Sequence, residues 1–172
     1  MKSLLFLLGF ATITAQAQPV FRAGVAAIDI TPTTFPRIIA GGFLEGRGDK
    51  IVDRLHVRSF VLDDGKMKIA FAIVDTCMME QSLIDEAKAL AAKQCGIPVD
   101  RMMVSATHTH SAPAAMGCLG TRKDTEYGKF LMPKIAEAIV TGVISGLLTL
   151  AGSYLFEDHA RRIRAIWARI SG

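Results

Sequence analysis

Residues 68–111 read KIAFAIVDTCMMEQSLIDEAKALAAKQCGIPVDRMMVSATHTHS, and this stretch decides the fold. Its first part, residues 68–74, is apolar at consecutive positions, which predicts a central strand buried on both faces. Apolar residues then recur at helical spacing over residues 81–93, and the glycine and proline of residues 95–98 end the helix. A second strand follows at residues 102–106. This order predicts a β-α-β unit whose two strands are parallel neighbours.

Two imidazoles come directly after the last of these strands, in the run Thr107-His108-Thr109-His110-Ser111. In an extended segment, residues i and i+2 share a face, so both rings are expected on the same side of the strand end. Ligands often bind at the carboxyl ends of strands in α/β sheets. The motif therefore predicts a metal centre or an acid–base pair. The alternative is two polar residues that cap a strand end and face water.

Asp75 ends the preceding strand in the same way. If the two strands are parallel neighbours, its carboxylate could approach His108 or His110. A carboxylate in that place would orient a metal-binding ring and raise its basicity. The alternative is an aspartate that serves only a turn or a helix N-terminus.

The residues before this unit predict the rest of the sheet. Residues 24–30 form a first strand that Pro32 closes, because proline lacks a backbone donor. Residues 41–49 are rich in glycine and predict an irregular loop. Residues 55–62 form a hairpin with the strand at 68–74 through the turn residues 63–65. The predicted fold class is α/β, with a mixed β-sheet, a β-α-β unit and flanking helices.

Length and charge limit the function classes. The chain has 172 residues, of which 51% are hydrophobic, so one domain with a real core is expected. The net charge of +4 comes largely from the last residues, where arginines outweigh Glu157 and Asp158, and from Lys2. The remainder is near neutral, so the basic pI does not indicate nucleic-acid binding.

The three cysteines are Cys77, Cys95 and Cys118. An odd number allows at most one disulfide within the chain, and the alternative is three small, buried or half-buried thiols. The spacing contains no Cys-x-x-Cys motif, so it gives no support to a thiolate-ligated metal.

The N-terminus predicts a signal peptide over residues 1–17. Lys2 precedes an apolar run, residues 4–11, and small residues at 15–17 offer a cleavage site before Gln18. The mature protein is then periplasmic or secreted. An N-terminal membrane anchor or a buried helix is the alternative.

Residues 138–156 carry no charge and reach the length of a membrane span, which needs to cross about 30 Å. Gly142 and Gly146 form a small-residue face that could pack on another helix, and arginines follow the run. We therefore divide the mature chain into a domain at 18–138 and an apolar helix with a basic tail at 139–172. The alternatives are a long buried helix broken near Gly152 and out-of-register translated sequence.

Several motifs occur in an order that resembles the N-terminal domain of neutral/alkaline non-lysosomal ceramidases. They are residues 23–32, 40–43, 55–60, 74–75 and 105–113, and the resemblance extends over residues 23–138. That family consists of secreted or membrane-associated zinc amidases, which hydrolyse the N-acyl bond of ceramide to sphingosine and a fatty acid. The resemblance implies a lipid amide substrate and one zinc ion.

The resemblance also implies roles for particular residues. His108 would be a zinc ligand, and His110 would line the pocket and bind or polarise the substrate. Gly41 and Gly42 would border that pocket, although a turn with positive φ would also explain them. A rival assignment makes both histidines ligands of the same ion.

The family completes its zinc site with a further histidine, a glutamate and a tyrosine from far downstream, and it places a serine and an arginine at the reaction centre. This chain does not contain these downstream residues. We therefore expect a partial catalytic domain that is truncated and inactive alone. The alternative is a non-catalytic exported module, tethered to the membrane through residues 138–156, which retains a relic His-x-His site. The oligomeric state stays open.

Overall fold

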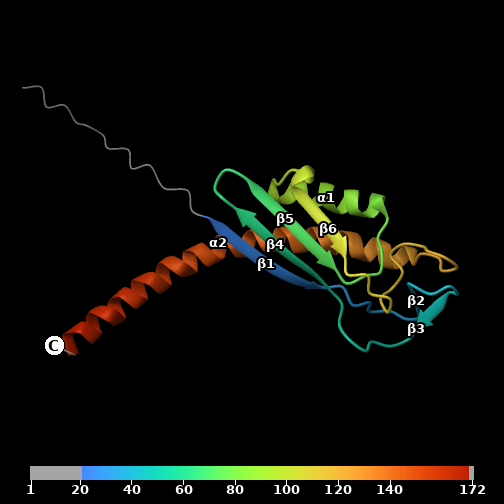
Figure 1. Cartoon of the computed structure of the whole chain (residues 1–172), viewed down its shortest axis with the longest axis horizontal. Coiled ribbons are helices and arrows are strands. Elements are labelled where there is room, and N and C mark those ends of the chain that lie inside the picture. The colour runs from blue at the N-terminus through green and yellow to red at the C-terminus, as the bar shows by residue number, and fades with distance from the viewer. Residues whose placement is uncertain (1–20, 171–172) are drawn as a thin grey trace, which may run out of the picture.

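The computed structural model describes the backbone of residues 21–170 and the side chains of residues 21–147. The predicted signal peptide at residues 1–17 lies outside the described residues and stays a prediction. Within the described part, the elements follow one another as strands, a helix, a strand and a long C-terminal helix (Figure 1).

The main sheet has four strands in the order β1 (Arg22–Asp29), β4 (His56–Asp63), β5 (Lys68–Val74) and β6 (Met102–Ala106). β1 and β5 both run antiparallel to β4, whereas β6 runs parallel to β5. The connection from β5 to β6 is helix α1 (Gln81–Cys95) followed by the short 3-10 turn η1 (Val99–Arg101). The predicted mixed sheet and its β-α-β unit are therefore confirmed.

The hairpin between β4 and β5 forms where the sequence predicts it. Gly65 has a φ of 85°, a left-handed conformation that glycine adopts without strain. The Asp64 carboxylate accepts hydrogen bonds from the backbone N–H groups of Lys66 and Met67 at 2.8 and 2.7 Å. These bonds fix the turn, and the register then pairs Phe60 with Phe71, whose rings stack at 4.4 Å.

Both helices pack on the same face of the sheet. Ala70 and Ala72 of β5 are buried in one cluster with Leu83 and Ala87 of α1 and with Leu131 of the C-terminal helix. In Figure 1 that long helix passes behind the sheet and extends beyond it. The core therefore lies between one sheet face and two helices.

The prediction that β5 is buried on both faces is wrong. Its residues alternate, and Ile69, Phe71 and Ile73 on the second face are only half-buried. The reason is that the described helices cover one face alone. Across the other face the register aligns a row of apolar side chains from four strands: Val25, Phe60, Phe71 and Met103.

A second sheet forms from two short strands, β2 (Arg37–Ile39) and β3 (Gly46–Gly48). The glycine-rich segment 41–49 is therefore not wholly irregular, as the sequence predicts, because its second half pairs with β2. Asp124 attaches this small sheet to the long helix. Its carboxylate accepts from Arg37 Nη1 at 3.2 Å and from the Tyr127 N–H at 2.9 Å, so it also caps the helix.

The long helix α2 (Thr125–Ile170) continues through Gly152 without a break. Among the described residues, one segment, Thr125–Leu147, is long and apolar enough to cross a membrane by length and composition. Several of its side chains, including Leu131, Ile135 and Ile139, are fully buried in the core. The start of the predicted span at 138–156 therefore belongs to the core, and membrane contact by its later part stays a prediction.

Glycines let α2 approach β1 closely. A Cβ on Gly24 would lie 2.0 Å from the Gly142 carbonyl oxygen and 2.5 Å from the Gly146 nitrogen. Ser145 Oγ accepts from the Val25 N–H and donates to the Val25 carbonyl, both at 2.8 Å, which ties the helix to this edge strand. The small-residue face predicted for contact with another helix packs instead on a strand.

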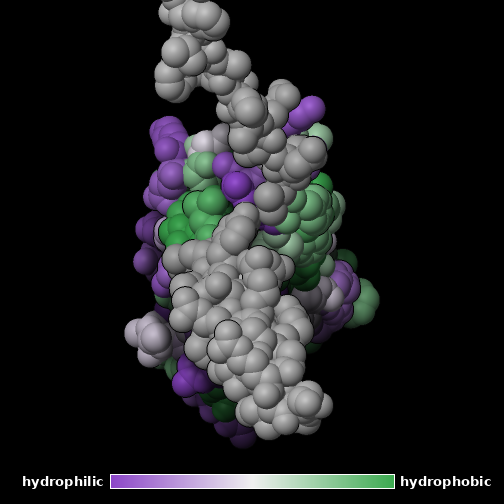
Figure 2. Space-filling view, turned by 90° about the vertical axis from the view of Figure 1, so that its left-hand side faces the viewer, coloured by the Kyte–Doolittle hydropathy of each residue, from purple (hydrophilic) through white to green (hydrophobic). Residues whose placement is uncertain are grey.

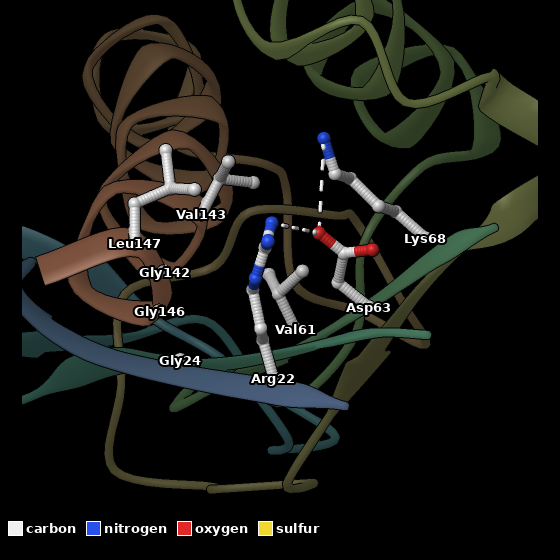
Figure 3. A pocket seen from close by; sticks show the side chains of 9 residues that line it. All are labelled: Arg22, Gly24, Val61, Asp63, Lys68, Gly142, Val143, Gly146 and Leu147. Carbon is white, nitrogen blue, oxygen red and sulfur yellow. Dashed lines mark ion pairs between the residues drawn. The ribbon is translucent and has the colours of Figure 1, made fainter. Parts of the chain in front are cut away.

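A cavity of about 10 Å³ lies beside this seam (Figure 3). Two cations point toward the Asp63 carboxylate: Arg22 Nη1 lies 3.6 Å and Lys68 Nζ 3.9 Å from Asp63 Oδ2. Gly24 and the glycines of α2 line the same cavity. Figure 2 shows hydrophobic residues at this end of the molecule. The cavity has room for no more than one water molecule, so it is part of the packing.

Candidate metal centre at the carboxyl ends of β5 and β6

The chain segments after β5 and β6 stay side by side. Val74 and Ala106 are the last register partners of the two strands. Beyond them the Thr107 N–H donates to the Val74 carbonyl at 2.9 Å, and the Thr109 N–H donates to the Thr76 carbonyl at 3.1 Å. The residues that follow each strand are thereby held at one edge of the sheet.

The two predicted histidines meet at this edge. The rings of His108 and His110 lie with centroids 4.7 Å apart and planes at 72°. The backbone is not extended there, contrary to the prediction, because His108 has a φ of 63°. A left-handed residue other than glycine is uncommon and marks a locally strained conformation, of the kind found at functional sites.

Cys77 joins the two imidazoles. The Cys77 carbonyl oxygen lies 3.0 Å from His108 Nδ1, and its Sγ lies 3.8 Å from the same nitrogen. One donor atom from each of Cys77, His108 and His110 falls within 4.8 Å of the others. The cysteine is buried and both histidines are exposed, so the two imidazoles are open to solvent.

Cys77 is not among the site residues that the sequence predicts. Its position in the sequence could have pointed to the site. Cys77 follows β5 by three residues, and β5 is parallel to β6, the strand that precedes the histidines. Burial raises the pKa of the Cys77 thiol, and the proximity of Cys118 adds to this. All three cysteines are free.

Gly41 lies directly against His110. A Cβ at this position would be 2.4 Å from His110 Nδ1, and the residue has a φ of 87°. Backbone pairing between residues 38–40 and 112–114 holds Gly41 close to His110. The Ala40 N–H donates to the Ala112 carbonyl at 3.0 Å, and the Ala114 N–H donates to the Ile38 carbonyl at 2.8 Å. Only glycine fits here without displacing the ring.

Gly42 has a different environment. Its carbonyl accepts a hydrogen bond from Thr121 Oγ1 at 3.0 Å, and a Cβ would meet the Leu44 carbonyl oxygen at 2.8 Å. It therefore shapes the loop that carries Gly41, and no hydrogen bond joins it to the histidines within the described part of the chain.

Asp75 binds to groups of β4, which flanks β5 on the side away from β6. Its Oδ2 accepts hydrogen bonds from the His56 N–H at 2.9 Å and from Arg58 Nη1 at 2.7 Å. These β4 groups hold the side chain, and among the described residues no hydrogen bond joins the carboxylate to His108 or His110. The partner of the His108 ring is the Cys77 carbonyl instead.

A cavity of about 240 Å³ opens beside Ser111, the residue after His110. Arg37, Lys50 and Asp53 supply charge at its wall, and much of the remaining lining is apolar: Phe35, Ile39, Ile51, Val52 and Leu55. The nitrogen and sulfur donors are thus followed directly in sequence by Ser111, which lines this partly apolar cavity.

The family model for the N-terminal part of neutral/alkaline non-lysosomal ceramidases matches residues 21–151. The chain belongs to this family. The match includes every residue of the site described above, as well as β1, the small sheet and the first half of α2.

Two solved ceramidase structures share the fold. The neutral ceramidase from Pseudomonas aeruginosa superposes with a TM-score of 0.65 at 24% identity, over 76% of this chain and 22% of that one. A ceramidase complexed with C2 gives a TM-score of 0.64 at 24% identity, over 73% and 21% of the respective chains. The chain therefore spans about a fifth of the length of these two proteins.

Proposed function

We propose that this ceramidase-family domain contributes His108 and His110 to the zinc centre of a hydrolase that cleaves the amide bond of a ceramide-like lipid. The observation that carries this proposal is the meeting of both imidazoles at the carboxyl edge of β5 and β6. Family membership supports the reaction class.

The donor set fits zinc. Zinc binds nitrogen and sulfur at about 2.0–2.3 Å in tetrahedral geometry, so two ligands of one ion lie about 3.5 Å apart. The candidate donors are within 4.8 Å of one another, which side-chain rotation can reduce to that spacing. When bound, zinc would lower the pKa of a coordinated water to about 7 and polarise the amide carbonyl.

The surrounding residues would position the two rings for separate roles. A proton on His108 Nδ1 donates to the Cys77 carbonyl, which leaves Nε2 as the metal-binding atom. His110 would hydrogen-bond the substrate oxygen beside the metal, with its ring held in place by Gly41. The partly apolar cavity next to Ser111 would receive an apolar part of the lipid.

Metal analysis of the purified chain tests the metal role. We expect about one zinc ion per chain in the wild type and its loss in His108→Ala, because an imidazole ligand is removed. His56→Ala is the matched control, since this imidazole lies in β4 and is not one of the grouped donors. Absence of zinc from the wild type at micromolar zinc would overturn the proposal.

Hydrolysis is measured separately, as release of fatty acid from a fluorescent ceramide. Release that depends on zinc and on His110 supports the hydrolase. A zinc-loaded chain that releases no fatty acid favours the second function, a non-catalytic module of the same family.

A further inference from the structure

We infer that Phe43, Leu44 and Leu119 form a docking surface, the loop patch, which binds the surface of an anionic lipid bilayer beside the site. This inference goes beyond the proposed function, and the choice of a bilayer as partner rests on it. A ceramide-like substrate lies in a membrane, so a hydrolase has to meet it there.

Large apolar side chains are unusually exposed in the loops beside β3. Among the described residues, the three most exposed are Leu44 at 85% and Phe43 and Val52 at 81%. β3 separates the first pair from Val52, which lines the cavity beside Ser111. Single exposed apolar residues are ordinary, whereas a contiguous group marks a surface that binds a partner or a membrane.

Leu119 joins the exposed pair because two loops are in contact. Thr121 Oγ1 donates a hydrogen bond to the Gly42 carbonyl at 3.0 Å. On the other side of the turn, a Cβ on Gly120 would lie 2.1 Å from the Phe43 carbonyl oxygen. The loops that carry the three side chains therefore form one surface.

The turn at Leu119 holds an apolar side chain in an unfavourable conformation. The N–H groups of Cys118 and Thr121 each donate to the other residue's carbonyl at 3.0 Å, so Leu119 and Gly120 form the tip. Leu119 is 67% exposed and has a φ of 55°. Glycine or asparagine adopts this conformation more readily, so the turn itself does not account for a leucine. Contact of its side chain with lipid does.

The loop patch lies next to the site. Gly41, which contacts His110, is two residues before Phe43. Figure 1 places β2 and β3 at the end of the molecule opposite the C-terminal end of α2. A membrane bound at the loop patch would therefore lie beside the histidines and away from the end of α2.

The loops around the patch carry an excess of positive charge. Residues 42–54 and 117–123 contain five arginines and lysines against three acidic residues. Arg47 and Arg122 both bind Glu45, so this group of three retains one positive charge. Apolar side chains flanked by cations are the usual combination for binding anionic lipid headgroups.

Sedimentation with lipid vesicles tests the loop patch in the full chain. We expect tighter binding to phosphatidylcholine vesicles that contain phosphatidylglycerol than to phosphatidylcholine alone, and a smaller difference at high salt. Phe43→Ser/Leu44→Ser should bind about tenfold more weakly, because two apolar side chains no longer enter the bilayer. Both side chains are exposed, so the thermal unfolding midpoint should equal that of the wild type.

Met67→Ser/Val99→Ser is the matched control. It also removes two exposed apolar side chains, each 46% exposed, but these precede β5 and β6 at the opposite edge of the sheet from the site. Its vesicle binding should equal that of the wild type. An equal loss in both double variants would overturn the loop patch.

Tryptophan fluorescence locates the contact. Trp167 is the single tryptophan of the chain, so Trp167→Phe/Phe43→Trp carries one reporter in the loop patch. Its emission should shift to shorter wavelength on vesicle binding and be quenched by brominated lipid. Trp167→Phe/Phe60→Trp, with the reporter in β4, should show neither change.

Unchanged vesicle binding in Phe43→Ser/Leu44→Ser, or no binding by the wild type, would overturn the inference. Wild-type dimers that this double variant dissociates would also overturn it, since a second copy would then cover the patch. Zinc content is measured on the same samples. Zinc without vesicle binding overturns the loop patch and leaves the proposed function standing, whereas patch-dependent vesicle binding without zinc supports the loop patch and overturns the zinc role of His108.

Discussion

At the scale of single residues, Gly41 has the clearest consequence for the site. Its φ of 87° and its contact with His110 place two demands on one position. In Gly41→Ala, left-handed strain costs about 1–2 kcal/mol, and the new methyl also pushes the His110 ring from its place. We expect lower stability in urea unfolding and about tenfold weaker zinc binding, typical of losing a group that orients a ligand.

Gly96→Ala separates these two effects. Gly96 has a φ of 73°, but a Cβ there meets nothing within 4 Å. This variant should lose a similar amount of stability, about 1–2 kcal/mol, and keep its zinc affinity. Equal zinc affinity in both variants would show that Gly41 does not position His110.

At the scale of elements, the seam between α2 and β1 depends on the absence of side chains. Gly24→Ala would place a methyl group 2.0 Å from the Gly142 carbonyl oxygen, so strand and helix must separate. We expect a loss of about 1–3 kcal/mol in the free energy of unfolding, the usual cost of overpacking. The loss is measured by urea or thermal denaturation followed by circular dichroism.

Gly128→Ala, in α2, is the control for Gly24→Ala. A Cβ there would lie 3.7 Å from Leu83 Cδ1, an ordinary contact. Alanine favours helix over glycine by about 1 kcal/mol, so this variant should be as stable as the wild type or more stable. If both variants lost the same stability, the close approach of α2 to β1 would not be the cause.

At the scale of the whole molecule, stability should decline toward both ends of the pH range. Hydrogen bonds from Thr31, and then the Arg54 guanidinium, lower the pKa of Asp29 from 3.8 to about 2. A lowered folded-state pKa stabilises the fold above pH 3.8, and this contribution is lost as the pH falls toward about 2. In Asp29→Asn, the acid part of the stability curve should be less steep.

Tyr127 acts at the alkaline end. Burial raises its pKa above the ordinary value of 10, and its hydroxyl donates to the Ile30 carbonyl at 2.9 Å. A raised folded-state pKa stabilises the fold below pH 10, and this contribution is lost as the pH rises further. Unfolding midpoints measured from pH 2 to pH 11 should show both declines, and Tyr127→Phe should weaken only the alkaline one.

The sequence by itself determined the local elements and their order. Residues 68–74, 81–93 and 102–106 carry enough periodicity to predict β5, α1 and β6, and the turn at 63–65 predicts the hairpin. From these, the position of the histidines at one sheet edge follows directly. These elements depend on interactions between residues close in sequence, so the local sequence pattern predicts them.

The tertiary structure alone decided the composition of the site and the one-sided burial of β5. Cys77 lies 31 residues before His108, and Gly41 reaches His110 through backbone pairing of distant loops. Asp75 turned to β4 because Arg58 and the His56 N–H lie within its reach. Such contacts depend on register and on the packing of segments far apart in sequence, which no local pattern specifies.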